Sequence, residues 1–335
     1  MSNLNFLNNK ECRISDFCVG TGGFTVASQL ANPDLYTTVF ANDMDKNSSI
    51  IYNKNFKDHQ FLLDDIHNLD PKEVPYFDIL TAGFPCQSYS LAGNRLGFGD
   101  PRSDVFWKLM EIVRHHKPRF VIFENVKNLH NHDNGNTFKV ISATIIEAGY
   151  LFKYKILNTS KVTTIPQNRE RIYIVCCREK SDYDLLQMNY PEKDLIPMSQ
   201  ILEEKVPDKY YYTKKSNIYD KLAESVVSEN TFYQYRRTFV RENKTGVCPT
   251  LTANAGTGGH NVCIIKDKHG IRKITPRESF RLQGFPENYE LNGFDDKNSE
   301  KLSDCSLYKL AGNAITVQVA KLIFQELSII IHTNF

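Results

Sequence analysis

Residues Arg13–Gly23 read RISDFCVGTGG, and this stretch decides the fold class. The run from Arg13 to Cys18 has the length and the apolar content of a buried strand, and Gly20–Gly23 supplies a glycine-rich turn. Apolar residues at helical spacing follow, namely Phe24, Val26, Ala27 and Leu30. A buried strand that turns through glycines into an apolar helix is the opening unit of a parallel α/β sheet.

The first 180 residues continue this alternation. Further strands are expected where short apolar runs are bounded by polar or turn residues, at Tyr36–Ala41, Phe77–Ala82, Arg119–Phe123, Phe152–Leu157 and Arg171–Cys176. Helices are expected between some of these strands, because apolar residues there recur at helical spacing. One such set is Val105, Leu109, Ile112 and Val113, and another is Val140, Thr144 and Ile145. We therefore predict an α/β fold with a doubly wound, mostly parallel sheet and helices on both faces.

The character of the chain changes between Pro191 and Pro207, which is polar, punctuated by proline and without a clear period. Short β-like stretches follow, and the last part, Thr316–Ile331, is helical and apolar enough to pack back onto the first domain. We predict a large domain at residues 1–195, a smaller β-rich domain at 196–300 and a returning C-terminal segment at 301–335.

Composition excludes several classes of protein. A chain of 335 residues with 41% hydrophobic and 24% charged residues is typical of a globular protein. Its start, MSNLNFLNNKECR, lacks the pattern of a signal peptide, and no apolar run approaches the ~20 residues that cross a bilayer. Eight cysteines without CxxC spacing predict neither a zinc site nor a disulfide framework. We expect a protein of the reducing cytoplasm, without a membrane partner or a metal.

Positive charge is concentrated in one segment. Residues 205–273 hold thirteen Lys or Arg and six Asp or Glu, a balance of +7, so a net charge of +2 leaves 2 − 7 = −5 for the rest. The same segment holds eight Tyr or Phe. Basic residues interleaved with aromatic ones suit a nucleic acid, although a solvated surface over a few core tyrosines fits the composition equally well.

The glycine turn suits a ligand that contains a nucleoside. Glycine lets the backbone approach a ligand closely, and the helix N-terminus adds a positive dipole end. Asp43 lies 23 residues beyond Gly20 at the end of the next strand, where acidic residues bind ribose hydroxyls. The turn lacks GxGxxG spacing, so NAD is not favoured, and a plain strand–helix corner is the alternative. Asp65 could reach an adenine amino group, but taken alone it reads as a loop carboxylate in water.

Cys86 is the candidate nucleophile. It lies in the sequence AGFPCQS at residues 82–88, just beyond a predicted strand, at the sheet edge where α/β proteins bind ligands. Pro85 stiffens this loop, and Ser88–Arg102 has the glycine-rich, polar composition of a lid rather than of a packing turn. A buried structural cysteine is the alternative for any lone thiol. A second strand ends in Glu124-Asn125-Val126, which brings a carboxylate to the same edge.

A thiol and a carboxylate together suit chemistry on a pyrimidine. Addition of the Cys86 thiolate to C6 of cytosine makes C5 enamine-like, and a proton or hydrogen bond at N3 eases that addition. Glu124 can supply it if burial raises its pKa. C5 can then accept a methyl group from a sulfonium donor, and loss of the C5 proton with elimination of Cys86 regenerates the enzyme. Arg169 and Arg171 are two residues apart, so they project to the same side of an extended segment. They could bind an anion or a carbonyl group, and a surface charge pair is the alternative.

Seven segments, in chain order, resemble motifs of the bacterial cytosine-5 DNA methyltransferases, the methylases of type II restriction-modification systems. They are DFCVGTGGF at Asp16–Phe24, NDMD at 42–45, GFPCQS at Gly83–Ser88, ENV at 124–126, QNRER at Gln167–Arg171, RLQGFP at Arg281–Pro286 and GNAITVQV at 312–319. The resemblance covers almost the whole chain and implies the S-adenosylmethionine-dependent methyltransferase fold with a target-recognition domain.

The resemblance also implies S-adenosylmethionine as cofactor and assigns roles. Cys86 becomes the nucleophile, Glu124 the partner of N3, and Arg169 and Arg171 supporting residues of the catalytic pocket. The residues expected around the cofactor are Phe17, Cys18, Gly20, Thr21, Gly22, Gly23, Asp43, Met44, Asp65, Ile66, Gly83, Pro85 and Asn313. Cys18 and Val19 stand where the family more often shows Phe-Ala or Phe-Cys just before the glycine. Cys18 is expected to weaken stacking on the adenine, and Phe17 to pack behind it.

The implied substrate is a short specific site in double-stranded DNA, with the target cytosine flipped out of the duplex. The recognition region would be Leu202–Ile274. The residues expected to contact DNA are Gln87, Ser90, Arg102, Arg236, Arg237, Arg241, Thr250, Thr252, Asn254, Gly258 and Gly259. A cognate restriction endonuclease would act in the same system without direct binding, and the methylase would act as a monomer.

Two alternatives remain. RNA-modifying relatives of this fold tend to carry a compact insert, whereas this chain has a longer basic segment with TLTAN followed by GTGG, so a structured RNA is the less favoured substrate. A non-catalytic DNA-binding derivative is supported only by the Cys18-Val19 pair, and the joint presence of Cys86, Glu124 and both arginines argues against it.

Overall fold

The computed structural model describes residues 11–85, 104–258, 261–291 and 301–334. Its largest element is a seven-stranded sheet in the order β3-β2-β1-β4-β5-β8-β6, and only β8 runs antiparallel to its neighbours. The strands are β1 (Cys12–Phe17), β2 (Tyr36–Asp43), β3 (Gln60–Leu63), β4 (Ile79–Gly83), β5 (Phe120–Val126), β6 (Leu151–Asn158) and β8 (Glu170–Cys177). The predicted α/β class with a mostly parallel sheet is confirmed.

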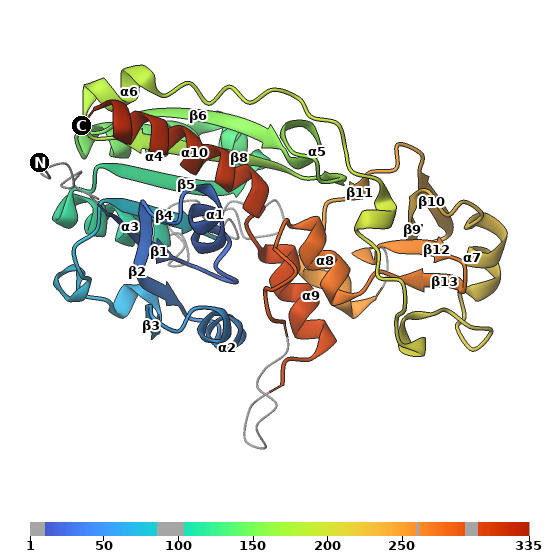
Figure 1. Ribbon diagram of the computed structural model, residues 1–335. Coiled ribbons are helices and arrows are strands. Elements are labelled where there is room, and N and C mark those ends of the chain that lie inside the picture. The colour runs from blue at the N-terminus through green and yellow to red at the C-terminus, as the bar shows by residue number, and fades with distance from the viewer. Residues whose placement is uncertain (1–10, 86–103, 259–260, 292–300, 335) are drawn as a thin grey trace, which may run out of the picture.

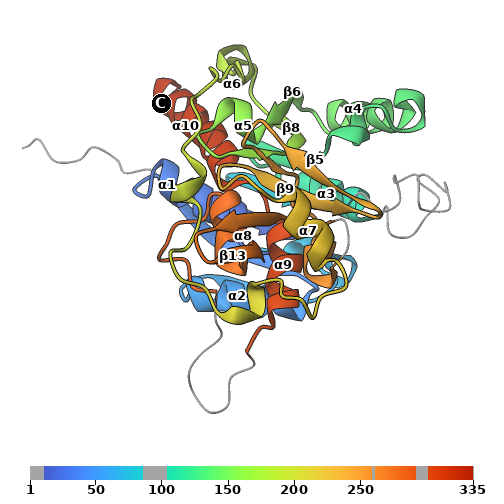
Figure 2. The same cartoon turned by 90° about the vertical axis from the view of Figure 1, so that its right-hand side faces the viewer.

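Helices cover both faces of this sheet. They are α1 (Gly23–Ala31), α2 (Lys46–Asn55), α3 (Asp104–His116), α4 (Asn136–Glu147), α5 (Thr159–Val162), α6 (Lys180–Leu185) and α10 (Val317–Thr333), with short 3-10 turns η1 (Ile66–Asn68), η2 (Pro71–Glu73), η6 (Lys127–His130) and η7 (His132–Gly135). One face packs against α1, α2 and α10, and the other against α3 and α4. Figure 2 shows α1 and α10 on one side of the strands and α3 and α4 on the other.

All six predicted strands are present, with ends within three residues of the prediction. Apolar side chains in these strands point to either face of the sheet, as those of Ile14 and Phe17 do in β1. The sequence analysis did not predict β3, whose residues Gln60–Leu63 are exposed or half-buried and give no buried-strand pattern.

The predicted C-terminal helix is α10, which returns to the large domain and packs on α1. Phe324 contacts Phe24 and Tyr36, with ring centroids 6.5 and 5.1 Å apart, and the Tyr36 hydroxyl donates to the Phe324 carbonyl at 2.8 Å. The stretch Asp304–Thr333 is long and apolar enough to cross a membrane, but 67% of its most apolar window is buried inside the molecule. It is therefore a core helix in this fold.

The smaller part of the chain contains a four-stranded antiparallel sheet in the order β10-β9-β12-β13. Its elements are β9 (Phe232–Arg236), β10 (Phe239–Asn243), β12 (Ile264–Asp267), β13 (Gly270–Lys273), α7 (Tyr219–Ser225), η8 (Met198–Gln200) and η9 (Asp208–Tyr210). Tyr210 and Tyr233 are buried, so part of the aromatic content of the basic segment belongs to a core. Arg237 and Arg241 are exposed, so its charge faces solvent.

Several short elements join the two sheets. They are β7 (Gln167–Asn168), β11 (Cys248–Pro249), η10 (Ala253–Thr257), α8 (Pro276–Leu282) and α9 (Asp304–Asn313). Figure 1 shows the small sheet to one side of the large one, with α8 and α9 between them. β7 and β11 pair in parallel, so the QNRER segment is joined by backbone hydrogen bonds to the chain that enters the TLTAN segment.

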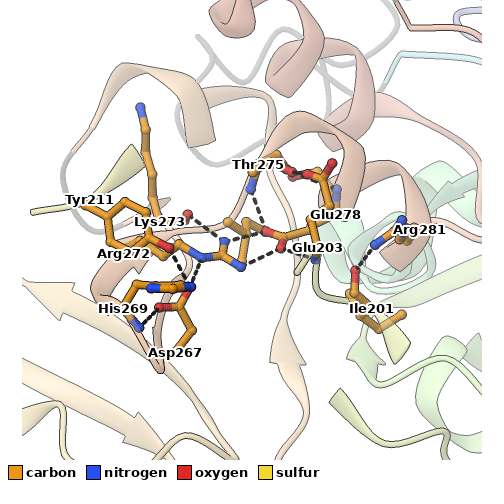
Figure 3. A network of polar contacts seen from close by, with 12 residues as sticks. Ile201, Glu203, Tyr211, Asp267, His269, Arg272, Lys273, Thr275, Glu278 and Arg281 are labelled. Carbon is orange, nitrogen blue, oxygen red and sulfur yellow. Dashed lines mark hydrogen bonds and ion pairs between the residues drawn. The ribbon is translucent and has the colours of Figure 1, made fainter. Parts of the chain in front are cut away.

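A buried ion pair anchors the small sheet to α8 (Figure 3). Arg272 of β13 is fully buried and donates to both carboxylate oxygens of Glu278 at 2.8 and 2.7 Å, while its Nε donates to Asp267 at 2.6 Å. Glu278 also accepts from the backbone nitrogens of Thr275 and Glu203 at 2.7 and 2.8 Å. Both buried charges are thus compensated by each other and by neighbouring polar groups.

Replacing Glu278 by glutamine should lower the free energy of unfolding by about 3 kcal/mol, because removing one partner of a buried pair leaves the other charge uncompensated. Urea denaturation measures this. The matched control is Asp184→Asn, which breaks an exposed pair with Lys180 on α6 and should cost about 0.5 kcal/mol or less. Equal losses in the two variants would contradict the anchoring role.

Candidate active site

The turn after β1 is shaped by positive φ angles. Cys18, Gly20 and Gly22 have φ of 51°, 55° and 71°. At Gly20 a Cβ would meet nothing within 4 Å, so the backbone conformation is the reason for glycine there. Asp43, at the end of β2, accepts a hydrogen bond from the Gly20 nitrogen at 2.8 Å and one from Asp45 at 2.8 Å. The predicted glycine turn and acidic residue therefore lie together at the carboxyl edge of the sheet.

The surroundings of Cys18 are acidic. Burial raises the pKa of the Cys18 thiol, and the negative charges of Asp43, Asp16 and Asp65 raise it further. Asp16 is buried beneath the turn, where it accepts from Thr81 at 2.8 Å, and burial raises its pKa to about 8. Burial likewise raises the pKa of Asp43, against the effect of its backbone hydrogen bonds.

The other predicted cofactor residues fall into two groups. Met44 is 70% exposed, and Asp65 and Asn313 are also partly or fully exposed, so their side chains can meet a ligand. Ile66 is buried, and so is Phe17, whose ring is 0% exposed and packs on Phe40 and Phe77 at 5.7 and 6.4 Å.

The Phe17 ring is thus covered by other side chains, and its assignment to the cofactor site stays a prediction. The physical reason is the alternation of side chains along β1. It turns Phe17 toward the α3 side of the sheet and Asp16 toward the α1 side.

The end of β4 leads directly to the candidate nucleophile. Phe84 is buried against Phe106 and Phe123, each with a centroid distance of 5.7 Å, and its carbonyl accepts from the Asn125 side chain at 3.1 Å. Pro85 is exposed. The predicted residues Cys86, Gln87, Ser90, Arg102 and Gly259 lie outside the described residues.

Glu124 is paired in register with Gly83, three residues before Cys86 in the sequence. A Cβ at Gly83 would lie 3.6 Å from Glu124 Oε2, so the carboxylate is directly beside the end of β4. The side chain is 10% exposed, and Arg171 Nε lies 3.2 Å from Glu124 Oε1. Burial raises the pKa of Glu124, and the charges of Arg171 and Arg169 oppose this rise. A carboxyl in this position can stay protonated to a higher pH than one in water.

Arg171 and Arg169 do different things. Arg171 contacts Glu124, whereas Arg169 is 2% exposed and donates to the backbone carbonyls of Leu251, Gly312 and Ala314 at 3.1, 3.2 and 2.9 Å. Burial lowers the pKa of Arg169 to about 9. Its guanidinium group holds protein backbone in the described part of the chain.

A polar hollow of about 310 Å³ opens beside Arg171. Its lining comes from the end of β5, from the QNRER segment and from the start of the TLTAN segment, through Val126, Lys127, Asn128, Asn131, Asn168, Glu170, Arg171 and Thr250. The Thr250 hydroxyl donates to the Asn168 carbonyl at 2.5 Å. The hollow therefore lies where the ends of β5 and β8 meet the start of the TLTAN segment.

The remaining residues predicted to contact DNA lie on two parts of the small domain. Arg236, Arg237 and Arg241 belong to the β9–β10 hairpin, where Arg237 has φ 58°. Thr252, Asn254 and Gly258 lie in or next to η10, and Asn254 and Gly258 are exposed. The Thr252 hydroxyl is buried without a hydrogen-bond partner among the described residues, so it is not presented to solvent.

Sequence reasoning identified the motifs but missed a buried junction between them. Gln167 donates to the Leu282 carbonyl at 2.6 Å and accepts from the Leu251 nitrogen at 3.2 Å. Gln283 donates to the Ala311 carbonyl at 2.6 Å and accepts from Thr316 at 3.2 Å. The glutamines of QNRER and RLQGFP were the available signal, because a buried amide needs partners on both of its atoms.

The chain was compared with known proteins. The family model for the C-5 cytosine-specific DNA methylase matches residues 12–328. The type II methyltransferase M.Bsp6I of Bacillus sp. (strain RFL6) is 45% identical over 323 residues, which cover 94% of this chain and 98% of that protein. The type II methyltransferase M.HhaI of Haemophilus parahaemolyticus is 32% identical, over 93% of this chain and 92% of that one.

Solved structures give the same fold. The Entamoeba histolytica methyltransferase EhMeth superposes with a TM-score of 0.73 at 17% identity, over 95% of this chain and 98% of that chain. The S. pombe Dnmt2 methyltransferase gives a TM-score of 0.71 at 21% identity, over 97% of this chain and 100% of that one. The methyltransferase fold implied by the sequence motifs is therefore shared.

Proposed function

Because the chain belongs to the C-5 cytosine-specific DNA methylase family and is a DNA (cytosine-5-)-methyltransferase, we propose that it methylates C5 of a flipped-out cytosine through a covalent Cys86–C6 adduct. The observation that carries this proposal is the position of Glu124. Its buried carboxyl lies beside Gly83, three residues before Cys86, and Arg171 holds one of its oxygens.

Family membership implies S-adenosylmethionine as the methyl donor, which supplies an electrophilic methyl group when bound. The turn at Cys18–Gly23, the ribose partner Asp43 and the exposed Asn313 fit such a ligand. The acidic side chains of Asp43 and Asp65 near Cys18 also suit a sulfonium, because opposite charges attract. Met44, Asp65, Ile66, Gly83 and Pro85 complete the proposed cofactor site.

In the proposed reaction the Cys86 thiolate adds to C6 while Glu124, in its protonated form, hydrogen-bonds N3. Electron density then reaches C5, which takes the methyl group. A base removes the C5 proton, the C5–C6 double bond re-forms, and Cys86 leaves as thiolate. Arg171 orients the Glu124 carboxyl and limits the rise of its pKa, so the group can pass a proton in both directions.

The polar hollow beside Arg171 suits the sugar and phosphate of an extruded nucleotide, because its lining carries amide, hydroxyl and cationic groups. The exposed Arg237 and Arg241 on the small sheet, with Arg236, suit the flanking duplex. We retain the division into residues 1–195, 196–300 and 301–335 as part of this proposal.

The proposal extends to the biological setting. We propose that the protein acts as a monomer in the bacterial cytoplasm on double-stranded DNA. A cognate endonuclease of the same restriction-modification system would cut the unmethylated site without binding the methylase.

Transfer of label from tritiated S-adenosylmethionine to plasmid DNA tests the activity, and bisulfite sequencing of the product then locates the site. We expect label in 5-methylcytosine at one short recurring sequence. The matched substrate is transfer RNA at the same nucleotide concentration, which should accept little label. Label on adenine, or faster methylation of transfer RNA, would overturn the proposed substrate.

A further inference from the structure

Residues 312–316 read GNAIT and span the last two residues of α9 and the three residues that lead into α10. We call them the linker, and they lie between the recognition segment and the cofactor turn. Four of its five residues are buried, and Asn313 alone is exposed. Thr316 is fixed by the Thr159 hydroxyl and the Gln283 side chain, each at 3.2 Å. The linker therefore has little freedom to move independently of what it touches.

One end of the linker is locked to the recognition segment. A Cβ at Gly312 would overlap the carbonyl group of Thr252 and the nitrogen of Ala253, so the two backbones are in direct contact. This contact requires glycine at position 312 for reasons of space. Any shift of Thr252 and Ala253 toward the linker must displace Gly312.

Arg169 ties the same two segments together. Its Nη1 donates to Leu251 and to Gly312, and its Nη2 donates to Ala314, so one guanidinium group bridges the recognition segment and the linker. The group is 2% exposed, so water cannot easily substitute for these bonds.

The other end of the linker touches both halves of the proposed reaction site. A Cβ at Gly23, at the start of α1, would lie 2.7 Å from Ile315 Cβ, and a Cβ at Gly83 would lie 2.9 Å from Ile315 Cδ1. Ile315 is 8% exposed. Its side chain thus lies between the cofactor turn and the end of β4 that leads to Cys86, and a glycine stands at each of these two contacts.

We propose that residues 312–316 couple target recognition to cofactor binding, with Arg169 and Ile315 as positioning residues at the two ends of the linker. The inference rests on the proposed function, because it needs duplex DNA at Thr250–Asn254 and the methyl donor at Gly20–Gly23. Binding at one site fixes the linker in the position that the other site requires, so each ligand increases the affinity of the protein for the other. The coupling must be equal in both directions.

The test measures the dissociation constant of S-adenosylhomocysteine by calorimetry, alone and with saturating duplex that contains the site found by bisulfite sequencing. In the wild type we expect the duplex to tighten binding by about 10-fold, within the usual range of coupling between sites. In Ile315→Val and in Arg169→Lys the duplex should tighten it by about 2-fold or less.

The matched control is Ile330→Val, which removes the same methylene from a 2% exposed isoleucine of α10 away from the linker. This variant should keep the wild-type coupling factor. Thermal denaturation of all variants shows whether each is folded at the assay temperature, and Arg169→Lys keeps the positive charge while losing the fork geometry that reaches three carbonyls.

Two outcomes would overturn the coupling: a wild type in which duplex leaves the affinity for S-adenosylhomocysteine unchanged, or linker variants that retain the full factor. Lower affinity with an unchanged factor would show that Ile315 only packs. Methylation of the same duplex by the wild type is measured first, so failure of the proposed function is recognised separately as absence of transfer.

Discussion

Glu124→Gln is expected to reduce the single-turnover rate of methyl transfer by about 10²–10⁴-fold, the usual contribution of general acid–base catalysis. Glutamine fills the same space beside Gly83 and can still contact Arg171, but it cannot deliver a proton to N3. The affinity for duplex should change little. Rapid-quench measurement of label transfer gives the rate, and equilibrium binding of the duplex gives the affinity.

The pH dependence gives a sharper result than the rate at one pH. Burial raises the pKa of Glu124, so its protonated form persists to higher pH than that of an exposed glutamic acid and is lost as the pH rises through the raised value. The wild-type rate should therefore fall as the pH rises through this raised value. Glu124→Gln should lack this fall.

The matched control is Glu111→Gln on α3, where the side chain is 56% exposed and paired with Lys108 at 2.9 Å. This variant should keep both the rate and the pH profile of the wild type. If the rate of Glu124→Gln still falls as the pH rises, another group causes that fall. This result would contradict the proton-donating role of Glu124.

The large sheet could be predicted well from the sequence because a buried strand has a local signal in its own residues. β1, β4 and β5 are rich in apolar residues and almost wholly buried, and glycine or polar residues at or just beyond their ends mark the edge at which ligands bind. β3 escaped prediction because its side chains are half-exposed. The reversed direction of β8 also escaped, because its pairing with β5 and β6 depends on the path of the chain and not on its own residues.

The candidate site was predicted as a set of residues, but their roles depend on contacts between distant parts of the chain. Gly23 and Gly83 were expected to serve a ligand, yet both also make room for Ile315. Arg169 and Arg171 belong to one motif, yet one bridges backbone carbonyls and the other holds Glu124. A single sequence shows which residue types lie at the ends of strands, but only the folded chain shows which of them face each other.

Cys86→Ser is expected to abolish methyl transfer, by about 10⁴-fold or more, the scale of losing a covalent nucleophile. A serine hydroxyl is almost wholly protonated at neutral pH, whereas a thiol is far more acidic and its thiolate is strongly nucleophilic. Duplex that contains 5-fluorocytosine at the target position traps the adduct, because fluorine at C5 cannot leave as the proton does. Wild-type protein should give a stoichiometric covalent complex on a denaturing gel in the presence of S-adenosylmethionine, and Cys86→Ser should give none.

Cys305→Ser, at an exposed free cysteine, is the matched control and should form the complex as the wild type does. A complex formed by Cys86→Ser would move the nucleophile to another residue.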